Sequence, residues 1–304
     1  MLYIEPAYAK INLFLDVLSK RPDGYHEIGT LFQTVSACDT LHAKELPHGE
    51  VTLSYSSAQD YPAETDLVYR AAQALRVYAD VHQGVALHLI KELPLGAGLG
   101  GGSADAAATL RLLNRMWKLG LKVDELCSIG AKLGADVPFL VEGGTALASG
   151  IGEILETIDI APLPENFVVA IATPHCAVPT KAAYSGILPS GDLRWERFRQ
   201  HFAGASPCAP LTSGSVMLNG IIANPMDIGF DLFNKFEESV LPLYPQIANL
   251  KCDFLRLGAV RALMSGSGAS VFGFFEDEPT AKCAILKIAS TIRWATIARF
   301  QQHC

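Results

Sequence analysis

The glycine-rich segment at residues 94–105, PLGAGLGGGSAD, constrains this chain more than any other feature. Five of its twelve residues are glycine, and glycine lets backbone N–H groups approach a ligand without a Cβ in the way. Val85, Leu87 and Leu89 alternate as a predicted strand before it, and an alanine-rich helix is predicted at about residues 103–117. A loop that opens a helix presents unpaired N–H groups and the positive end of the helix dipole, so we expect a polyphosphate site here.

The predicted phosphate contacts run through the loop and into the first turn of the helix. Ser103 is placed either to cap that helix or to put its hydroxyl on a phosphate-bound metal ion. Lys91 is expected to be an exposed lysine at the end of the strand rather than a nucleotide ligand. The predicted nucleotide-binding residues are Pro94, Leu95, Gly96, Ala97, Gly98, Leu99, Gly100, Gly101, Gly102, Ser103 and Ala104.

Three other interpretations of this loop are weaker. Residues 96–101 fit the G-x-G-x-x-G fingerprint, but a dinucleotide fold needs a strand after the helix, and residues 121–133 indicate a second helix instead. A Walker A loop needs a lysine after its glycines, and none follows here. A flexible linker is disfavoured because the flanking strand and helix are both strongly apolar.

Composition narrows the class of protein. The chain has 304 residues, enough for two domains, and a net charge of −7, which favours neither a nucleic-acid nor an anionic-membrane surface. Its seven cysteines are scattered without a CxxC pair, which indicates free thiols rather than disulfides or a zinc site. No apolar span of membrane length and no leader pattern is evident, so we expect a cytoplasmic protein.

The order of predicted elements indicates an α+β protein with two domains. Residues 1–162 carry strand patterns and then the glycine loop with its helices, and we assign them to an N-terminal domain that binds the nucleotide. The proline-rich stretch at 162–166 is the predicted linker. Residues 163–304 alternate strands with helices, as in a two-layer α+β domain, and we assign them to substrate binding.

Two stretches of the second half carry further expectations. Residues 186–214, rich in Gly, Ser and Pro, form the least ordered-looking region, and residues 230–241 indicate a helix. The segment Ser265–Gly268 is either a second glycine turn that closes on the phosphates or a tight turn before a core strand.

Two polar residues stand in apolar surroundings in the first half. Lys10 interrupts a predicted strand of Ala9, Ile11 and Leu13, where a solvent-facing lysine is an equally good interpretation. Asp136 follows a helix end and precedes Val-Pro-Phe, a position typical of a helix N-cap or a turn. Phosphoryl transfer needs a phosphate cradle, a cation and an acceptor for the hydroxyl proton, and these two residues could supply the last two.

Five motifs occur in one order along almost the whole chain, and together they resemble the 4-diphosphocytidyl-2-C-methyl-D-erythritol kinase family. This family lies within the galactokinase, homoserine kinase, mevalonate kinase and phosphomevalonate kinase (GHMP) superfamily. The glycine loop and the Ser-Gly-Ser-Gly turn mark the superfamily, whereas the Pro-Asp-Gly-Tyr-His segment is specific to this member. The motifs are Ala7 to Leu13, Arg21 to Glu27, the glycine loop, Gly134 to Phe139 and Met264 to Gly268.

The resemblance implies a two-domain GHMP-kinase-type α+β fold with a ferredoxin-like C-terminal domain. It implies an enzyme that uses ATP, with Mg²⁺ inferred from the chemistry, to phosphorylate the 2-hydroxyl of 4-diphosphocytidyl-2-C-methyl-D-erythritol in the non-mevalonate isoprenoid pathway. The catalytic pair maps onto Asp136, the acceptor of the hydroxyl proton, and Lys10, which pairs with it and offsets phosphoryl charge.

The same resemblance implies how the substrate is held. Tyr25 stacks on the cytosine and His26 bonds its edge, while Tyr184 and Thr180 supply a second wall and Asn12 a polar contact. Taken alone, the Tyr25–His26 pair would indicate only a half-buried aromatic pair after a turn.

The sequence departs from the family pattern at Asp66, Lys181 and Lys235. A negative charge at Asp66 is unfavourable for a nucleotide contact. Three rival functions are a kinase for homoserine or mevalonate, a catalytically silent nucleotide-binding regulator and a nicotinamide oxidoreductase. The aromatic residues that suit a base oppose the first, and the intact Lys10 and Asp136 oppose the second.

Overall fold

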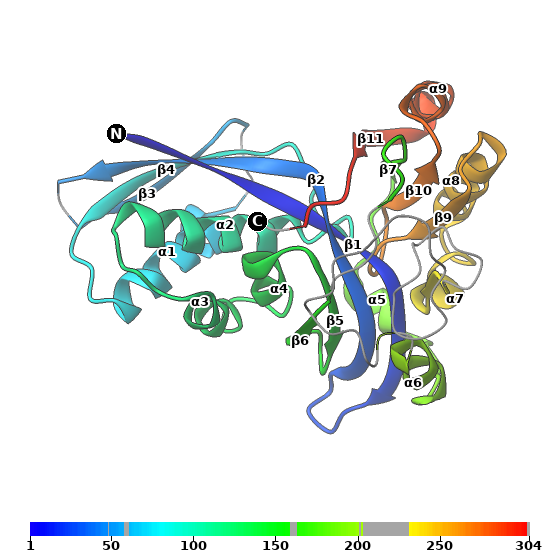
Figure 1. Cartoon of the computed structure of the whole chain (residues 1–304), viewed down its shortest axis with the longest axis horizontal. Helices are drawn as coiled ribbons and strands as arrows, with labels where there is room; N and C mark the ends of the chain where they lie inside the picture. Colours follow the sequence, from blue (N-terminus) through cyan, green and yellow to red (C-terminus); the bar gives the residue numbers. More distant parts are fainter. Residues whose placement is uncertain (48, 58–60, 159–162, 201, 203–230, 303–304) are drawn as a thin grey trace.

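Two long antiparallel strands, β1 (Leu2–Lys20) and β2 (His26–Leu46), run through the middle of the molecule (Figure 1). The structure is a computed structural model, and it describes residues 1–304 except 48, 58–60, 159–162, 201, 203–230 and 303–304. The two strands anchor a seven-stranded sheet of order β3-β4-β2-β1-β8, with β5 paired to β2 and β6 to β5. Its other strands are β3 (Val51–Tyr55), β4 (Gly84–Ile90), β5 (Thr145–Ser149), β6 (Ile154–Thr157) and β8 (Phe233–Asn234).

The predicted interruption of the first strand corresponds to two of the three register irregularities within a continuous strand. The register between β1 and β2 shifts between Tyr8 and Lys10 and again between Asn12 and Phe14. Such bulges turn side chains away from the regular alternation. The two irregularities lie on either side of the segment from Lys10 to Asn12, so the side chains of these two residues can depart from the regular alternation.

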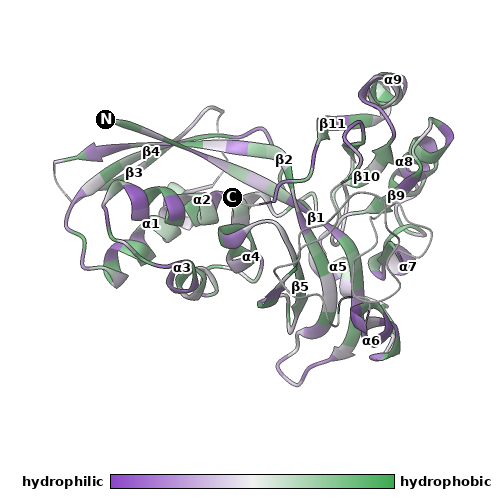
Figure 2. Cartoon of the chain, in the orientation of Figure 1, coloured by the Kyte–Doolittle hydropathy of each residue, from purple (hydrophilic) through white to green (hydrophobic). Residues whose placement is uncertain are grey.

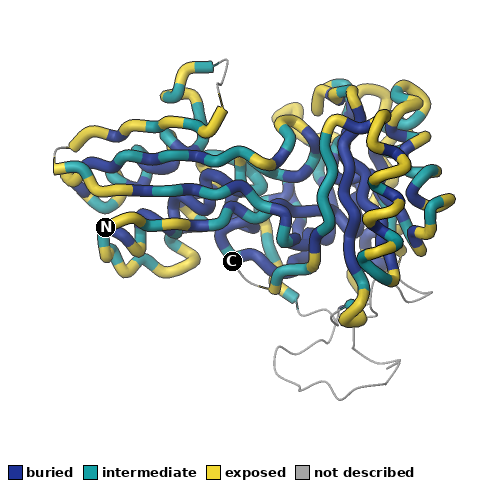
Figure 3. The backbone as a smooth tube through the Cα atoms, turned by 90° about the horizontal axis from the view of Figure 1, so that it is seen from above, coloured by how far each residue is buried: buried dark blue, intermediate teal, exposed yellow. Residues whose placement is uncertain are grey.

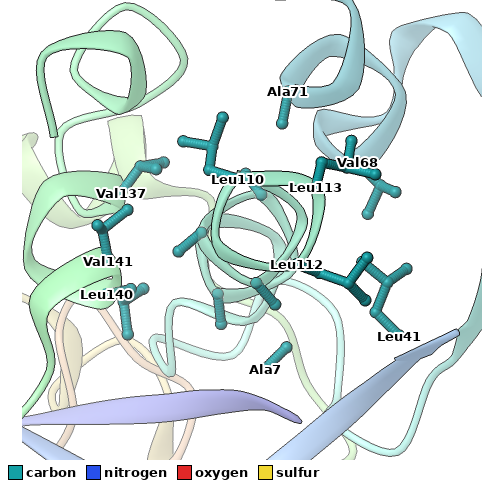
Figure 4. Packing of buried hydrophobic residues seen from close by; sticks show 14 of the residues in the cluster. Ala7, Leu41, Val68, Ala71, Leu110, Leu112, Leu113, Val137, Leu140 and Val141 are labelled. Atoms are coloured by element: carbon teal, nitrogen blue, oxygen red, sulfur yellow. The ribbon is translucent and has the colours of Figure 1, made fainter. Parts of the chain in front are cut away.

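The helices that follow the glycine loop pack on one face of this sheet. Helix α2 is buried almost all round, between the sheet, α1 and α4, which explains its run of alanines (Figure 4). It begins at residue 101 and ends at 116, close to the predicted 103–117. The elements on this side are η1 (Ala63–Thr65), α1 (Leu67–Tyr78), α2 (Gly101–Met116), α3 (Val123–Gly130) and α4 (Val137–Glu142).

The second half contains a four-stranded antiparallel sheet of order β11-β7-β10-β9. With α8 between β7 and β9, and α9 between β10 and β11, this is the β-α-β-β-α-β arrangement expected of a ferredoxin-like domain. Helices α8 and α9 mix hydrophilic and hydrophobic residues, as helices with one face on a sheet do (Figure 2). The elements are β7 (Val168–Pro174), α8 (Pro245–Arg256), β9 (Arg261–Met264), β10 (Val271–Phe275), α9 (Glu278–Ile288), η2 (Ala289–Thr291) and β11 (Ile292–Ala298).

The two halves share a hydrophobic core. Ile11 and Leu13 of β1 lie in one buried cluster with Ile171 of β7 and Phe272 and Phe274 of β10. Strand β7 is buried along its whole length, and buried residues fill the centre of the molecule (Figure 3). The second half also returns β8 to the first sheet, where it runs parallel to β1.

Two predictions for the second half are wrong in part. The helix predicted at residues 230–241 is the short strand β8 followed by α7 (Phe236–Val240), because Phe233 and Asn234 pair with β1 and the helix begins only after them; residue 230 lies outside the described residues. The weakly ordered region predicted at 186–214 contains helix α6 (Leu193–Gln200), whose Trp195 and Phe198 are buried against Phe14. The part from 203 onward lies outside the described residues, and α5 (Thr180–Tyr184) precedes the region.

None of the described helices combines the length and the apolar character needed to cross a membrane.

Candidate active site

The glycine loop leaves β4 and enters α2 through a left-handed residue. Gly100 is the N-cap of α2 with φ of 70°, a conformation that favours glycine, and no side chain caps the helix. The alternative in which Ser103 caps this helix is therefore wrong, because the helix begins at Gly101 and Ser103 already lies within its first turn.

Three successive carbonyl groups of the loop are held by the protein. The Ala97 carbonyl accepts from the Ser270 N–H at 3.1 Å, and the Leu99 carbonyl accepts from the Lys10 N–H at 3.0 Å. Between them, the Ser265 hydroxyl donates to the Gly98 carbonyl at 2.9 Å. In the described part of the chain, no backbone N–H of residues 98–103 donates to a protein acceptor. The loop thus has its acceptors occupied and its donors free, which is the arrangement of an anion site.

Lys10 and Asp136 come together beside this loop. The Lys10 Nζ lies 3.6 Å from Asp136 Oδ2, and the lysine side chain is only 6% exposed, which excludes a solvent-facing lysine. Asp136 is the N-cap residue of α4 by position, but its carboxylate makes no capping hydrogen bond. The carboxylate, 32% exposed, is therefore available to the lysine and to a ligand.

A chain of hydrogen bonds orients the lysine. Lys10 Nζ donates to Asn12 Oδ1 at 2.8 Å, Asn12 Nδ2 donates to the Thr30 hydroxyl at 2.9 Å, and that hydroxyl donates to the Phe14 carbonyl at 2.6 Å. The ammonium also lies 5.1 Å from the centre of the Phe32 ring. All these residues belong to β1 and β2, so the lysine is fixed by the central strand pair of the first sheet.

One cavity of about 530 Å³ joins these groups. Its wall includes Gly96, Gly98 and Gly100 of the loop, and Gly266, Ser267 and Gly268 of the turn between β9 and β10. The turn therefore lines the cavity and also joins β9 to the core strand β10, so both alternatives for Ser265–Gly268 remain compatible with the structure. The predicted site residues that line the cavity from elsewhere are Lys10, Asn12, Asp136, Thr180 and Tyr184.

An aromatic cluster stands at another part of the cavity wall. The rings of His26 and Tyr184 stack with their centres 4.6 Å apart, and Phe236 meets Tyr184 edge-on at 4.7 Å. Burial, and secondarily the nearby Asp136, raise the pKa of the Tyr184 phenol to about 12. Tyr25 lies outside this cluster with 61% of its surface exposed.

The remaining predicted residues lie around the cavity rather than in its wall. Ala97, Leu99 and Ala104 have their side chains in the core, so only their backbone faces outward. The Thr180 hydroxyl lies 3.5 Å from that of Ser267, which connects α5 to the glycine turn. The predicted residues that do not line the cavity are Tyr25, His26, Pro94, Leu95, Ala97, Leu99, Gly101, Gly102, Ser103 and Ala104.

Comparison with known proteins agrees with this geometry. Residues 66–144 match the family model described as GHMP kinases N terminal domain, and residues 219–292 match GHMP kinases C terminal. A protein of Geobacillus kaustophilus named 4-diphosphocytidyl-2-C-methyl-D-erythritol kinase is 40% identical over 90% of this chain and 88% of its own. The protein of the same name from Paraburkholderia phytofirmans is 39% identical over 98% of this chain and 94% of its own.

The chain belongs to the 4-diphosphocytidyl-2-C-methyl-D-erythritol kinase family. A crystal structure of a 4-(cytidine 5'-diphospho)-2C-methyl-D-erythritol kinase superposes with a TM-score of 0.74 at 30% identity, covering 97% of this chain and 99% of the other. A homoserine kinase from Cytophaga hutchinsonii has a TM-score of 0.72 at 20% identity, covering 99% of this chain and 95% of its own, and shows the shared fold.

One group beside the site of this family member was not predicted from the sequence. Lys91 lies between Asp39 on β2 and Asp105 on α2, with Nζ–Oδ2 distances of 2.5 and 2.7 Å. Its side chain is 8% exposed, so the expectation of an exposed lysine is wrong: Lys91 follows the end of β4, which pairs within β2 rather than at its end, and the carboxylates of Asp39 and Asp105 enclose its ammonium. Asp39 Oδ1 also accepts from the N–H groups of Glu92 and Leu93. The triad therefore joins both ends of the glycine loop.

The departures from the family pattern have structural partners. Asp66 caps α1 through the Val68 N–H at 2.8 Å, and its other oxygen accepts from the Tyr55 and Tyr61 hydroxyls at 3.1 and 2.9 Å. The carboxylate is thus satisfied within the protein. Lys235 pairs with Glu238 at 2.6 Å, whereas Lys181 is exposed on α5.

Proposed function

We propose that this protein is an ATP-dependent kinase that phosphorylates the 2-hydroxyl of 4-diphosphocytidyl-2-C-methyl-D-erythritol, a step of the non-mevalonate route to isoprenoid precursors. The observation that carries the proposal is one cavity bounded by the free amides of the glycine loop, the Lys10–Asp136 pair and an aromatic wall. Family membership supports the kinase chemistry, and the names of the relatives support the substrate.

In the reaction, the acceptor hydroxyl attacks the γ-phosphorus of ATP. Asp136 takes the proton of that hydroxyl as the new O–P bond forms, and ADP leaves as the bond from the γ-phosphorus to its bridging oxygen breaks. The ammonium of Lys10, held by Asn12, lies between Asp136 and the transferred phosphoryl group. It offsets the negative charge of that phosphoryl group.

The polyphosphate lies on the backbone amides of residues 96–103. Mg²⁺ bound with ATP would supply positive charge that offsets the charge of the phosphates. In the described part of the chain, no group of three or more acidic, histidine or cysteine side chains could hold a metal, which suits an ion held mainly by phosphates and water. The Ser103 hydroxyl, which does not cap α2, is the side chain of the loop available to the metal.

The cytidine end lies toward the aromatic cluster. Tyr184, stacked on His26 and in edge contact with Phe236, lines the cavity, and its phenol is neutral at neutral pH. A base that stacks on a ring of this cluster gains about 1–3 kcal/mol. We assign Tyr25 and His26 to contacts with the same base, and Thr180 and Asn12 to polar contacts with the substrate. The proposed function involves neither a nucleic acid nor a membrane.

We keep the division into an ATP-binding part at 1–162 and a substrate-binding part at 163–304 as part of this proposal. A cytoplasmic location suits ATP as donor and the free thiols of the described cysteines.

The test is an assay that couples ADP release to a visible signal, with the cytidyl substrate and with homoserine in parallel. Turnover on the cytidyl substrate alone supports the proposal. Turnover on homoserine, or ADP release that ignores the acceptor, contradicts it.

A further inference from the structure

A buried asparagine outside the predicted site connects the second glycine turn to the first sheet. Asn234 lies on β8, beside Leu15 of β1, and is 2% exposed. Its Nδ2 group donates to the carbonyls of Met264 at 2.7 Å and Gly266 at 2.8 Å. Its Oδ1 accepts from the Phe236 N–H at 3.0 Å. One side chain thus makes three hydrogen bonds, and both of its donor hydrogens are used.

The turn held by Asn234 is packed directly against the phosphate loop. The Ser265 hydroxyl donates to the Gly98 carbonyl at 2.9 Å. A Cβ at Gly98 would lie 2.1 Å from the Ser265 carbonyl oxygen, and one at Gly266 would lie 3.1 Å from the Gly98 oxygen. The backbones of the turn and the loop are closely packed, so a displacement of the turn would also displace the loop.

The same segment supports the other end of the cavity. Phe236, whose N–H is bound by Asn234, carries the ring that meets Tyr184 edge-on. Glu237 then accepts from the Met264 N–H at 2.9 Å. Residues 234–237 therefore hold both the turn at the phosphates and the support of the aromatic wall.

We propose that Asn234 is a positioning residue for phosphoryl transfer, which sets the direction of the phosphate-loop amides through the Ser265–Gly268 turn. The inference rests on the proposed function, because it assumes that those amides bind the phosphates of ATP. It assigns to the second half of the chain a role in nucleotide binding, in addition to substrate binding.

The discriminating substitution is Asn234→Asp, which keeps the shape but removes both donors. The carboxylate would face two carbonyl oxygens, so the turn must move away from it. We expect the Kd of ADP to rise about tenfold, whereas the Kd of AMP, which retains only the phosphate nearest the ribose, rises at most about twofold. Calorimetric titration measures both.

Asn114→Asp is the matched control. Asn114 donates to the Leu121 carbonyl at 2.9 Å and accepts from the Leu121 N–H at 3.0 Å, at the end of α2 far from the loop. The same chemical change there should leave both affinities within about twofold of the wild-type values. Equal loss of ADP binding in the two variants would show a general effect of stability and overturn the proposal.

A second variant covers the case in which Asn234→Asp does not fold. Ser265→Ala removes only the hydroxyl bond to Gly98 and should weaken ADP binding about fivefold, since one neutral hydrogen bond contributes about 1 kcal/mol. Wild-type ADP affinity in a folded Asn234→Asp protein, or in Ser265→Ala where Asn234→Asp does not fold, overturns the positioning role. Failure of the wild-type protein to bind ADP would instead contradict the proposed function itself.

Discussion

The two ends of the cavity are built in different ways. At the proposed phosphate end the groups assigned to the ligand are backbone amides, and the loop that carries them is held by β1, by the turn at 265–268 and by the Asp39–Lys91–Asp105 triad. At the aromatic end the groups are side chains on a turn and on the five-residue helix α5, and Tyr25 is largely exposed.

This difference separates two kinds of recognition. Backbone amides cannot be exchanged by substitution, so the phosphate end depends on neighbours that fix the course of the chain. Side chains can be exchanged one at a time, so the aromatic end can change its ligand without change in the fold. Substitutions at the phosphate end should affect ATP binding or turnover. Substitutions at the aromatic end should affect only the KM for the cytidyl substrate.

The largest effect is expected where the two ends meet. Asp136→Asn removes the proton acceptor but keeps the shape, and should lower kcat about a thousandfold with the KM for ATP nearly unchanged. Steady-state kinetics of ADP release measure both constants. Asp124→Asn, at an exposed position of α3, is the control. Near-normal turnover in Asp136→Asn would remove Asp136 as the base.

Gly98→Ala tests whether the phosphate end depends on close packing. Its φ of 78° and the Ser265 oxygen at 2.1 Å from a new Cβ both oppose the change. Overpacking and the left-handed backbone together should destabilise the fold by about 2–4 kcal/mol and abolish most ATP binding.

Gly96→Ala is the matched control for this test. Gly96 has φ of 61° but nothing within 4 Å of the added Cβ. Only the left-handed backbone then opposes alanine, at about 1 kcal/mol. Thermal unfolding and ADP titration should show a much larger loss in Gly98→Ala; equal losses would mean that strain, rather than packing, governs this end.

Substitutions at the aromatic end should have smaller effects, and these should be limited to the KM for the cytidyl substrate. Tyr184→Ala should raise the KM for the cytidyl substrate about tenfold and leave that for ATP within about twofold. Tyr184→Phe keeps the ring and should behave as wild type, because the hydroxyl is not required for stacking. Equal changes in both KM values for Tyr184→Ala would assign the ring to folding alone.

Tyr25→Ala probes the exposed member of the same end. It should raise the KM for the cytidyl substrate by less than Tyr184→Ala, about threefold, since Tyr25 has no place in the stacked cluster. Initial rates at fixed ATP measure it. A larger effect than that of Tyr184→Ala would make Tyr25 the principal wall.

The last expected effect is a pH dependence of stability at the phosphate end. Burial, and then the neighbouring Asp39, raise the pKa of Asp105 from 3.8 to about 8 against the opposing pull of Lys91. The folded state then holds a proton that the unfolded state loses, so this contribution to stability falls as pH rises from about 4 to about 8.

Asp105→Asn removes that contribution. The Tm of the wild type minus the Tm of this variant should decrease steadily as the pH rises over the same range, by on the order of ten degrees. Thermal unfolding in matched buffers measures it. A difference that does not vary with pH would mean that Asp105 is ionised when folded.

Features that depend on short runs of residues could be predicted from the sequence. The glycine loop, the helix after it and the α+β alternation of the second half are confirmed by the structure, because glycine content and apolar periodicity act locally. Lys10 could not be assigned to solvent or to a site from its position alone. Its burial depends on the bulges in β1 and on two glycine turns far away in the chain.

The contacts missed from the sequence are all long-range. Lys91 looked exposed because its partners Asp39 and Asp105 lie 52 and 14 residues away. Asn234 stands in a two-residue strand, too short for any periodicity to show. Nothing around it indicates that it reaches a turn 30 residues further on.

Strand β8 has a consequence for any attempt to divide this protein. Strand β8, from the second half of the chain, pairs with β1 of the first sheet. The C-terminal segment also contacts this sheet, through the bridge from Val35 to Phe300 and the hydrogen bond from the Gln301 N–H to the Thr34 carbonyl. A fragment cut after residue 162 would lack these edge partners and half of a common core. The two halves should be recoverable only when expressed together, as complementing pieces rather than as independent modules.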